Sequence, residues 1–193
     1  MNDTISTNLP PQFNEIKKVS EALGFTLTCD MYTGSILRTL ATSKPNANIL
    51  ELGTGTGLSL AWIVDGMDEN SKVLSIDNDP KLVDIAKSHF QNDNRVNIEC
   101  CDGKDWLESY DGEKFDLVFA DAYPGKIFDK EKVHDLIKVG GLYVIDDLTI
   151  KPGWSVEHQQ KIQELIADME RLENFQITKL NWSTGLIIAA KKY

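Results

Sequence analysis

The sequence has few cysteines and no long apolar run, and each shortage excludes a class of protein. Its three cysteines, Cys29, Cys100 and Cys101, are odd in number and two are adjacent, a pattern that does not form a disulfide framework. We expect Cys100 and Cys101 to be buried or half-buried thiols in a reducing compartment. No stretch approaches the roughly 18 apolar residues of a membrane-spanning helix, so a membrane partner is not expected.

Basic residues are also scarce, which argues against a polyanionic partner. The chain has 20 lysines and arginines against 30 aspartates and glutamates, and its formal net charge is −10. Nucleic-acid binding requires a basic face, so no nucleic-acid partner is expected. The stretch MNDTISTNLPPQF lacks the basic region and following apolar region of a signal peptide. We therefore expect a cytoplasmic protein.

Hydrophobic spacing predicts helices followed by alternating strands and helices. The 193 residues, 41% of them hydrophobic, favour one domain, residues 1–193, with an ordinary core. A helical segment, residues 1–45, contains two helix patterns and should contribute to the cofactor and substrate side; a core follows at residues 46–193. The predicted helices are 13–25, 31–43, 57–67, 80–90, 103–110, 130–139 and 156–172, and the predicted strands are 48–52, 72–77, 95–101, 114–121, 140–146, 175–182 and 184–192.

This alternation predicts an α/β fold. We expect a Rossmann-like, seven-stranded, mostly parallel sheet with helices on both faces and a C-terminal antiparallel hairpin strand. In such sheets, ligands bind outside the carboxyl ends of the strands, where the strand order reverses. The residues that follow the predicted strands are therefore the candidates for chemistry.

A glycine-rich loop follows the first predicted strand. In the stretch ELGTGTGLS, three glycines, Gly53, Gly55 and Gly57, follow the acidic Glu51. Glycine allows a sharp turn and a close approach to a ligand, and the next helix offers free N–H groups at its N-terminus. The dinucleotide fingerprint G-x-G-x-x-G requires a small residue at the position of Leu58. The loop thus predicts a ligand site but weakens the case for nicotinamide.

Aspartates close the other predicted parallel strands. Asp77 ends the second strand, where a carboxylate can accept both hydroxyls of a ribose. Asp102 ends the third strand, where it could also cap the next helix. Asp121 ends the fourth strand, and Asp146 and Asp147 end the fifth.

The last three carboxylates should meet at one rim of the sheet. A bare cluster of this kind has raised pKa values, and a hard divalent cation such as Mg²⁺ would relieve the repulsion. The alternative is that one aspartate caps the next segment and another is solvated. The residues leave both interpretations open.

The loop and strand ends together resemble class I S-adenosylmethionine-dependent methyltransferases, in particular the cation-dependent O-methyltransferases of the catechol and caffeoyl-CoA type. The resemblance covers about residues 31–193 and includes the GGLYVIDDL strand end. It implies S-adenosylmethionine as cofactor, a small-molecule acceptor with a hydroxyl group, and a homodimer as a candidate assembly. It also implies that Asp102 meets the adenine amino group. The cofactor-binding residues expected on this basis are Met31, Glu51, Gly53, Thr54, Gly55, Gly57, Ser59, Asp77, Asn78, Asp102, Gly103 and Asp121.

The resemblance also implies catalytic and metal-binding residues. The expected ligands of Mg²⁺, or of another hard divalent cation, are Asp121, Asp146 and Asp147, where Asp147 replaces an asparagine of the family. The family's lysine base follows the strand-four aspartate closely, whereas a proline-containing turn displaces Lys126 in the stretch DAYPGKIF. The expected catalytic residues are therefore Asp121 and Asp146, either as cation ligands or as general bases.

Several alternatives stay open at this point. Tyr123, Trp154 and His158 are candidates to border a planar acceptor, although packing roles would explain them equally. A nicotinamide-dependent oxidoreductase and an aminopropyltransferase would share the sheet. A nucleic-acid amino-group methyltransferase would show an Asp/Asn-Pro-Pro-aromatic run, which DAYP only superficially resembles. A cofactor-binding module without catalysis is the non-enzymatic alternative.

Overall fold

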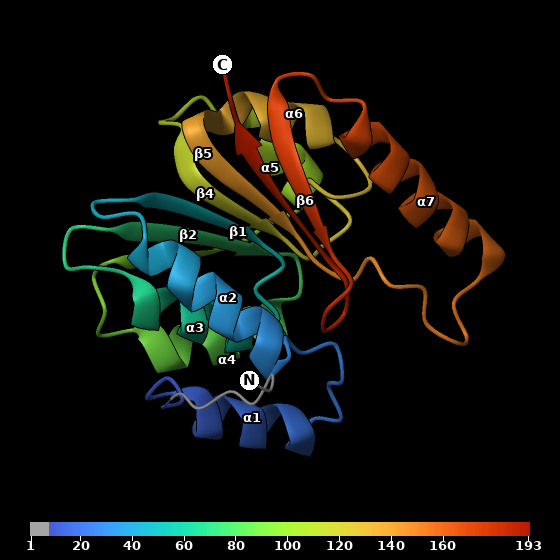
Figure 1. Ribbon diagram of the computed structural model, residues 1–193. Helices are drawn as coiled ribbons and strands as arrows, with labels where there is room; N and C mark the ends of the chain where they lie inside the picture. The colour runs from blue at the N-terminus through green and yellow to red at the C-terminus, as the bar shows by residue number, and fades with distance from the viewer. Residues whose placement is uncertain (1–7) are drawn as a thin grey trace.

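A seven-stranded sheet is the middle layer of the molecule in the computed structural model, which describes residues 8–193 (Figure 1). The first seven residues of the predicted N-terminal segment lie outside the described residues. The strand order is β3-β2-β1-β4-β5-β7-β6, with the first five strands parallel and β7 antiparallel to both neighbours. The predicted fold class is confirmed. The strands are β1 (Asn48–Leu52), β2 (Lys72–Asp77), β3 (Val96–Cys100), β4 (Phe115–Ala120), β5 (Ile137–Ile145), β6 (Phe175–Leu180) and β7 (Leu186–Lys191).

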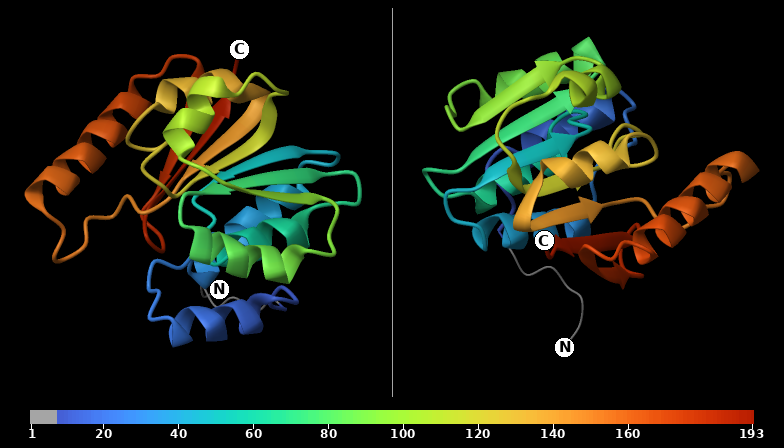
Figure 2. Two further views of the ribbon diagram at one scale, coloured as in Figure 1. Left: turned by 180° about the vertical axis from the view of Figure 1, so that it is seen from behind. Right: turned by 90° about the horizontal axis from the view of Figure 1, so that it is seen from above.

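Helices cover both faces of this sheet (Figure 2). On one face, α2 and α3 pack together with α4, and α1 lies outside them (Figure 1). The other face is covered by α5, α6 and α7. Each face has its own apolar core, and the sheet separates the two. The helices are α1 (Phe13–Ala22), α2 (Met31–Thr42), α3 (Leu58–Gly66), α4 (Pro80–Phe90), α5 (Gly103–Ser109), α6 (Lys130–Leu136) and α7 (Val156–Glu170).

The boundary between α6 and β5 differs from the prediction. The helix pattern was expected to reach residue 139, but the backbone of Ile137 is extended (φ −87°, ψ 132°) and this residue opens β5. Ile137 is fully buried and pairs with Phe115 of β4. The ladder then shifts register before Leu142, and Gly140 adopts a φ of 78° at this irregularity. Pairing with β4 therefore overrides the local helical spacing.

The cysteine prediction is wrong for one residue. Cys101 is half-buried as expected, but Cys100 is exposed. It ends β3, an edge strand that has only one neighbour in the sheet. A strand at an edge leaves more of its side chains in solvent than a central strand does.

The strand order reverses at β1. This strand pairs with β2 on one side and with β4 on the other, and Leu52 lies level with Ile76 and Ala120. The residues that follow these strands therefore emerge side by side at one edge of the sheet. This edge is where a ligand is expected in an open α/β fold.

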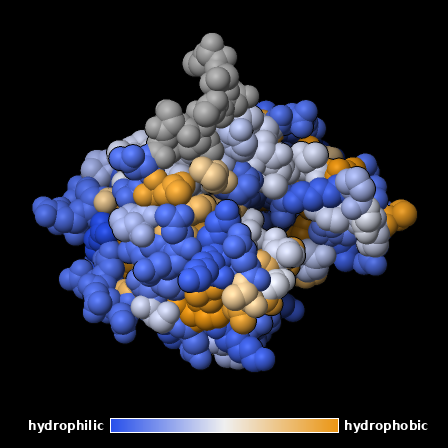
Figure 3. Space-filling model, turned by 90° about the horizontal axis from the view of Figure 1, so that it is seen from below, coloured by the Kyte–Doolittle hydropathy of each residue, from blue (hydrophilic) through white to orange (hydrophobic). Residues whose placement is uncertain are grey.

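The molecular surface is mostly hydrophilic on the face seen from below, and its hydrophobic patches are limited in size (Figure 3). Scattered apolar side chains of this kind are ordinary on protein surfaces. None of the helices within residues 8–193 has the length and apolar character needed to cross a membrane.

Candidate active site

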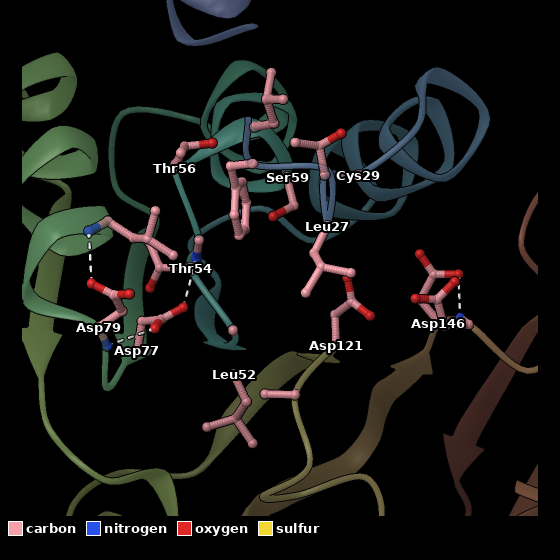
Figure 4. Close-up of a pocket in the computed structure, with 18 of the residues that line it drawn as sticks. Leu27, Cys29, Leu52, Thr54, Thr56, Ser59, Asp77, Asp79, Asp121 and Asp146 are labelled. Carbon is pink, nitrogen blue, oxygen red and sulfur yellow. Dashed lines mark hydrogen bonds between the residues drawn. The ribbon is translucent and has the colours of Figure 1, made fainter. Parts of the chain in front are cut away.

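A cavity of about 560 Å³ lies at the carboxyl ends of the central parallel strands (Figure 4). This volume falls in the range of small-molecule sites, roughly 300–1,000 Å³. The loop after β1 forms one wall and the ends of β4 and β5 form another. The segment from Phe25 to Asp30, which joins α1 to α2, covers the cavity from the opposite side.

The glycine loop is fixed to β2 by its backbone. Gly53, Gly55 and Gly57 have φ values of 105°, 52° and 96°, which only glycine adopts readily. The N–H groups of Gly53 and Thr54 donate to the carbonyl of Ile76 at 2.9 and 3.2 Å. The loop is thus held in place before any ligand arrives.

Glu51 supports this loop from beneath. Its carboxylate accepts a hydrogen bond from the hydroxyl of Ser75, which also contacts the hydroxyl of Thr54 at 2.6 Å. Glu51 is fully buried, and its Oε1 has no hydrogen-bond partner among the described residues. Burial raises the pKa of Glu51 to about 8. This residue therefore acts behind the cavity wall rather than on it.

Asp77 is the carboxylate at the end of β2. Its Oδ2 accepts the N–H of Gly55 at 2.8 Å and its Oδ1 accepts the N–H of Asp79 at 3.0 Å. Both contacts orient the carboxylate into the cavity, where Asn78 and Asp79 also contribute (Figure 4). The arrangement can accept hydrogen bonds from ligand hydroxyl groups.

Asp102 caps a helix, as one interpretation of the sequence predicted. Its carboxylate accepts the N–H groups of Lys104 and Asp105 at 2.8 and 3.3 Å, at the start of α5. Gly103 reaches the cavity wall whereas Asp102 does not. The contact of Asp102 with adenine stays a prediction.

Asp121 and Asp146 lie together at the other end of the cavity, away from Asp77 and Asp79 (Figure 4). Only 3% of Asp146 is exposed. Its Oδ1 accepts the hydroxyl of Thr184 and, at 2.6 Å, the N–H of Asp147. Desolvation raises the pKa of Asp146, and raises the pKa of Asp121 to about 7.

Lys126 returns to this rim despite its displacement in the sequence. The carbonyl of Tyr123 accepts the N–H groups of Lys126, Ile127 and Phe128 at 3.2, 2.8 and 3.0 Å, which closes a tight turn. Lys126 is only 5% exposed, and its Nζ lies 3.7 Å from Oδ1 of Asp121. The proline-containing turn thus directs the ammonium group back toward the strand-four aspartate.

Lys151 is a second ammonium group at the rim. Its Nζ donates to Oδ1 of Asp147, four residues earlier in the chain. Both residues line the cavity. The sequence analysis missed Lys151, because a four-residue spacing from Asp147 signals an ion pair only within a helix and this segment is not helical.

The predicted metal ligands do not form a chelating group in this structure. Within residues 8–193, no cluster of three or more His, Cys, Asp or Glu side chains is arranged to hold a metal ion. Asp121 faces Lys126, Asp147 is paired with Lys151, and Asp146 accepts two hydrogen bonds. Donors of the protein itself thus occupy this rim.

Most of the predicted site residues meet at the cavity, but four do not reach its wall. Met31 opens α2 and is 38% exposed, directly after Asp30, which caps that helix and lines the cavity. Glu51 and Gly57 lie behind the wall, and Asp102 lies beside it. The predicted residues that line the cavity are Gly53, Thr54, Gly55, Ser59, Asp77, Asn78, Gly103, Asp121, Asp146 and Asp147.

The aromatic candidates are divided between the cavity and its surroundings. Tyr123 lines the cavity and is 47% exposed. Its hydroxyl lies 3.0 Å from Nδ1 of His158, and the ring of Trp154 packs edge-on against that histidine. Tyr123 can therefore contact a ligand, whereas Trp154 supports it from behind.

Comparisons with known proteins agree with this geometry. The model of the O-methyltransferase family matches residues 3–191. A presumed O-methyltransferase of Mycolicibacterium vanbaalenii is 30% identical over 173 residues, which cover 82% of this chain and 74% of that protein. A presumed O-methyltransferase of Mycobacterium leprae is 32% identical over 95 residues, 47% of this chain, and the match spans 42% of that protein's length.

Two solved structures have the same fold. The O-methyltransferase from Bacillus cereus in complex with SAH has a TM-score of 0.84 at 23% identity, over 97% of this chain and 94% of that chain. The O-methyltransferase TomG from Streptomyces achromogenes, in complex with SAM, has a TM-score of 0.86 at 18% identity, over 98% and 93%. At these identities the likeness concerns the fold alone.

Proposed function

This chain belongs to the O-methyltransferase family, and we propose that it transfers the methyl group of S-adenosylmethionine to a hydroxyl oxygen of a small-molecule acceptor. The proposal rests on one observation: a single cavity joins the glycine loop and Asp77 to the carboxylates of Asp121 and Asp146. The SAH and SAM bound in the two structural neighbours support the choice of cofactor.

The cofactor would bind along the β1 and β2 side of the cavity. Asp77 would accept the ribose hydroxyls, because its carboxylate is already oriented by the N–H groups of Gly55 and Asp79. Apolar side chains of Ile76 and Leu82 line the same part of the cavity and would face the adenine ring. Four predicted cofactor residues do not line the cavity and would support cofactor binding indirectly: Met31, Glu51, Gly57 and Asp102.

The methyl transfer would take place at the β4 and β5 side. The acceptor oxygen attacks the methyl carbon, the carbon–sulfur bond breaks, and its electron pair stays on sulfur. The hydroxyl proton passes to a carboxylate, for which Asp121 and Asp146 are the candidates. Fixing the acceptor in line with the sulfonium methyl group supplies much of the rate enhancement.

A divalent cation does not fit the donor set as it stands. Mg²⁺ takes about six oxygens, of which water supplies several and protein carboxylates one or two. Among the described residues no three carboxylates are arranged around one point, and Lys126 and Lys151 bring two ammonium groups to the same rim. The proposed reaction therefore runs on the carboxylates and lysines of this chain, and no step is derived through a metal.

A turnover assay tests the proposal. The purified chain is incubated with methyl-labelled S-adenosylmethionine and a panel of small hydroxyl compounds, and mass spectrometry detects S-adenosylhomocysteine and the methylated acceptor. Asp146→Asn should lower kcat by about 10²–10⁴-fold, the usual contribution of a general base, with little change in cofactor affinity. Asp84→Asn, on the exposed side of α4, is the matched control and should leave kcat unchanged.

The outcomes separate the alternatives. Cofactor binding without turnover on the whole panel would contradict the proposal and favour a binding module. Turnover that persists in Asp146→Asn and in Asp121→Asn would show that neither carboxylate takes the proton. The homodimer suggested by the family resemblance is a separate part of the proposal, and sedimentation equilibrium distinguishes monomer from dimer.

A further inference from the structure

The lysine that faces Asp147 is the least expected feature of the rim. Lys151 lines the cavity, and its ammonium group donates to Asp147. The loop between them is fastened to the β6–β7 hairpin, because the N–H groups of Leu148 and Thr149 donate to the carbonyls of Gly185 and Thr184 at 3.1 and 2.9 Å. The fold therefore holds the backbone that precedes Lys151, and the side chain of Lys151, which is 42% exposed, is directed by its contact with Asp147.

The ammonium groups at the rim argue against a bound divalent cation. The ammonium groups of Lys126 and Lys151 offset two of the three carboxylate charges of Asp121, Asp146 and Asp147. A divalent cation at the same point would approach both ammonium groups, and Asp146 already accepts two hydrogen bonds at its Oδ1. The two ammonium groups therefore meet part of the electrostatic demand that a cation would otherwise meet.

We propose that the ammonium group of Lys151, held by Asp147, takes the place of a divalent cation in this site and orients the acceptor oxygen, so that the chain methylates without a metal. The inference rests on the proposed methyltransferase function. An ammonium group has three N–H donors, of which Asp147 takes one. The others can stabilise the negative charge that develops on the acceptor oxygen.

The inference also concerns the class of acceptor. A metal ion can bind two neighbouring oxygens at once, whereas an ammonium group is a point charge that donates single hydrogen bonds. An acceptor of this chain therefore needs one hydroxyl at the rim and gains nothing from a second, vicinal oxygen.

Metal binding provides the first test, because it does not depend on turnover. Mn²⁺ is titrated into the wild-type chain, and electron paramagnetic resonance measures the free ion. Any Mn²⁺ binding that the wild-type chain shows should persist in Asp146→Ala. Lys151→Met removes one of the two ammonium groups and should raise the affinity for Mn²⁺ at least tenfold. The control is Lys72→Met, at an exposed position at the end of β2 away from Asp77 and the cavity, and it should leave the affinity for Mn²⁺ unchanged.

Activity provides the second test. Turnover should be the same in EDTA and in excess Mg²⁺, and vicinal diols should not be preferred over single hydroxyls. Lys151→Met should lower kcat at least tenfold at unchanged cofactor affinity, with partial rescue in Lys151→Arg. If the role of Lys151 were purely structural, its replacement would lower the thermal stability instead of kcat. Lys151→Met and Lys151→Arg would then have the same kcat.

The results separate this inference from the proposed function. A wild-type Mn²⁺ site that disappears in Asp146→Ala, or turnover abolished by EDTA, would overturn the inference while the methyltransferase function stands. Absence of S-adenosylmethionine binding would overturn the proposed function, and the wild-type Mn²⁺ titration would still decide whether the rim holds a metal.

Discussion

Glu51 shows how a single buried residue couples the site to pH. Its folded-state pKa of about 8 lies above the ordinary value of 4.5. The folded chain therefore keeps a proton that the unfolded chain releases. The favourable contribution is complete below the unfolded pKa of 4.5 and is lost as pH rises toward and through about 8.

Replacing this carboxyl group should remove the pH dependence that it causes. Glu51→Gln keeps an oxygen acceptor for Ser75 but cannot ionise. Between pH 6 and pH 9, the free energy of unfolding of the wild-type chain should fall by about 1–3 kcal/mol more than that of Glu51→Gln, because one pKa unit is worth about 1.4 kcal/mol.

Urea denaturation at the two pH values measures this difference. Glu69→Gln, at an exposed position, is the control and should behave like the wild-type chain. Parallel pH profiles for the wild-type chain and Glu51→Gln would show that Glu51 is ionised in the folded state at pH 6.

At the residue scale, the sequence predicted the rim aspartates but not their partners. Asp121 and Asp146 follow parallel strands, so their meeting point follows from topology alone. Lys126 and Lys151 reach the rim through loop conformations that no periodicity encodes. The sequence predicted that residues 1–45 contribute to the cofactor and substrate side, but it did not single out the segment from Phe25 to Asp30, which lines the cavity.

At the element scale, the contact between α2 and α3 depends on a missing side chain. Gly34 of α2 faces Trp62 of α3, which is fully buried. A Cβ atom at Gly34 would lie 2.3 Å from Cδ1 of that ring, which is too close for any contact. Phe13 of α1 packs edge-on against the same ring at 5.7 Å, so the ring has little room to retreat.

Gly34→Ala should therefore destabilise the chain even though alanine favours helices. Overpacking a filled core costs typically about 1–3 kcal/mol. Thermal or urea denaturation measures the loss, and Thr39→Ala on the exposed side of the same helix should change the free energy of unfolding by less than about 0.7 kcal/mol. A neutral or stabilising effect of Gly34→Ala would mean that α2 and α3 are less tightly packed than described.

Elements were predicted well where local pattern and tertiary pairing agree. All seven strands and seven helices were expected near their observed positions. The exception is the end of α6, where the apolar run around Ile137 reads equally well as helix or strand. Only its pairing with Phe115 of β4 decides between them, and that contact is not local.

At the scale of the whole molecule, the two apolar cores share one sheet. One core contains Trp62 and the other contains Trp106, and both pack against the same central strands. A single domain over residues 1–193 stays a prediction, and it requires that the two cores unfold together.

Urea denaturation followed by far-ultraviolet circular dichroism and by tryptophan fluorescence tests this. The two transitions should coincide. A double variant, Trp62→Phe with Trp182→Phe, limits the fluorescence change to the core that contains Trp106 and should leave them coincident. Transitions with different midpoints would show that the two faces of the sheet unfold separately and would contradict the single-domain prediction.

The most direct test of the central claim is a calorimetric titration of S-adenosylmethionine into the purified chain in EDTA. The account predicts one binding site per chain. Asp77→Ala should weaken the affinity at least tenfold, because it removes the acceptor for the ribose hydroxyls, whereas Asp84→Ala should not. Absence of binding, or binding that is indifferent to Asp77→Ala, would contradict the proposal that this cavity is the cofactor site of a methyltransferase.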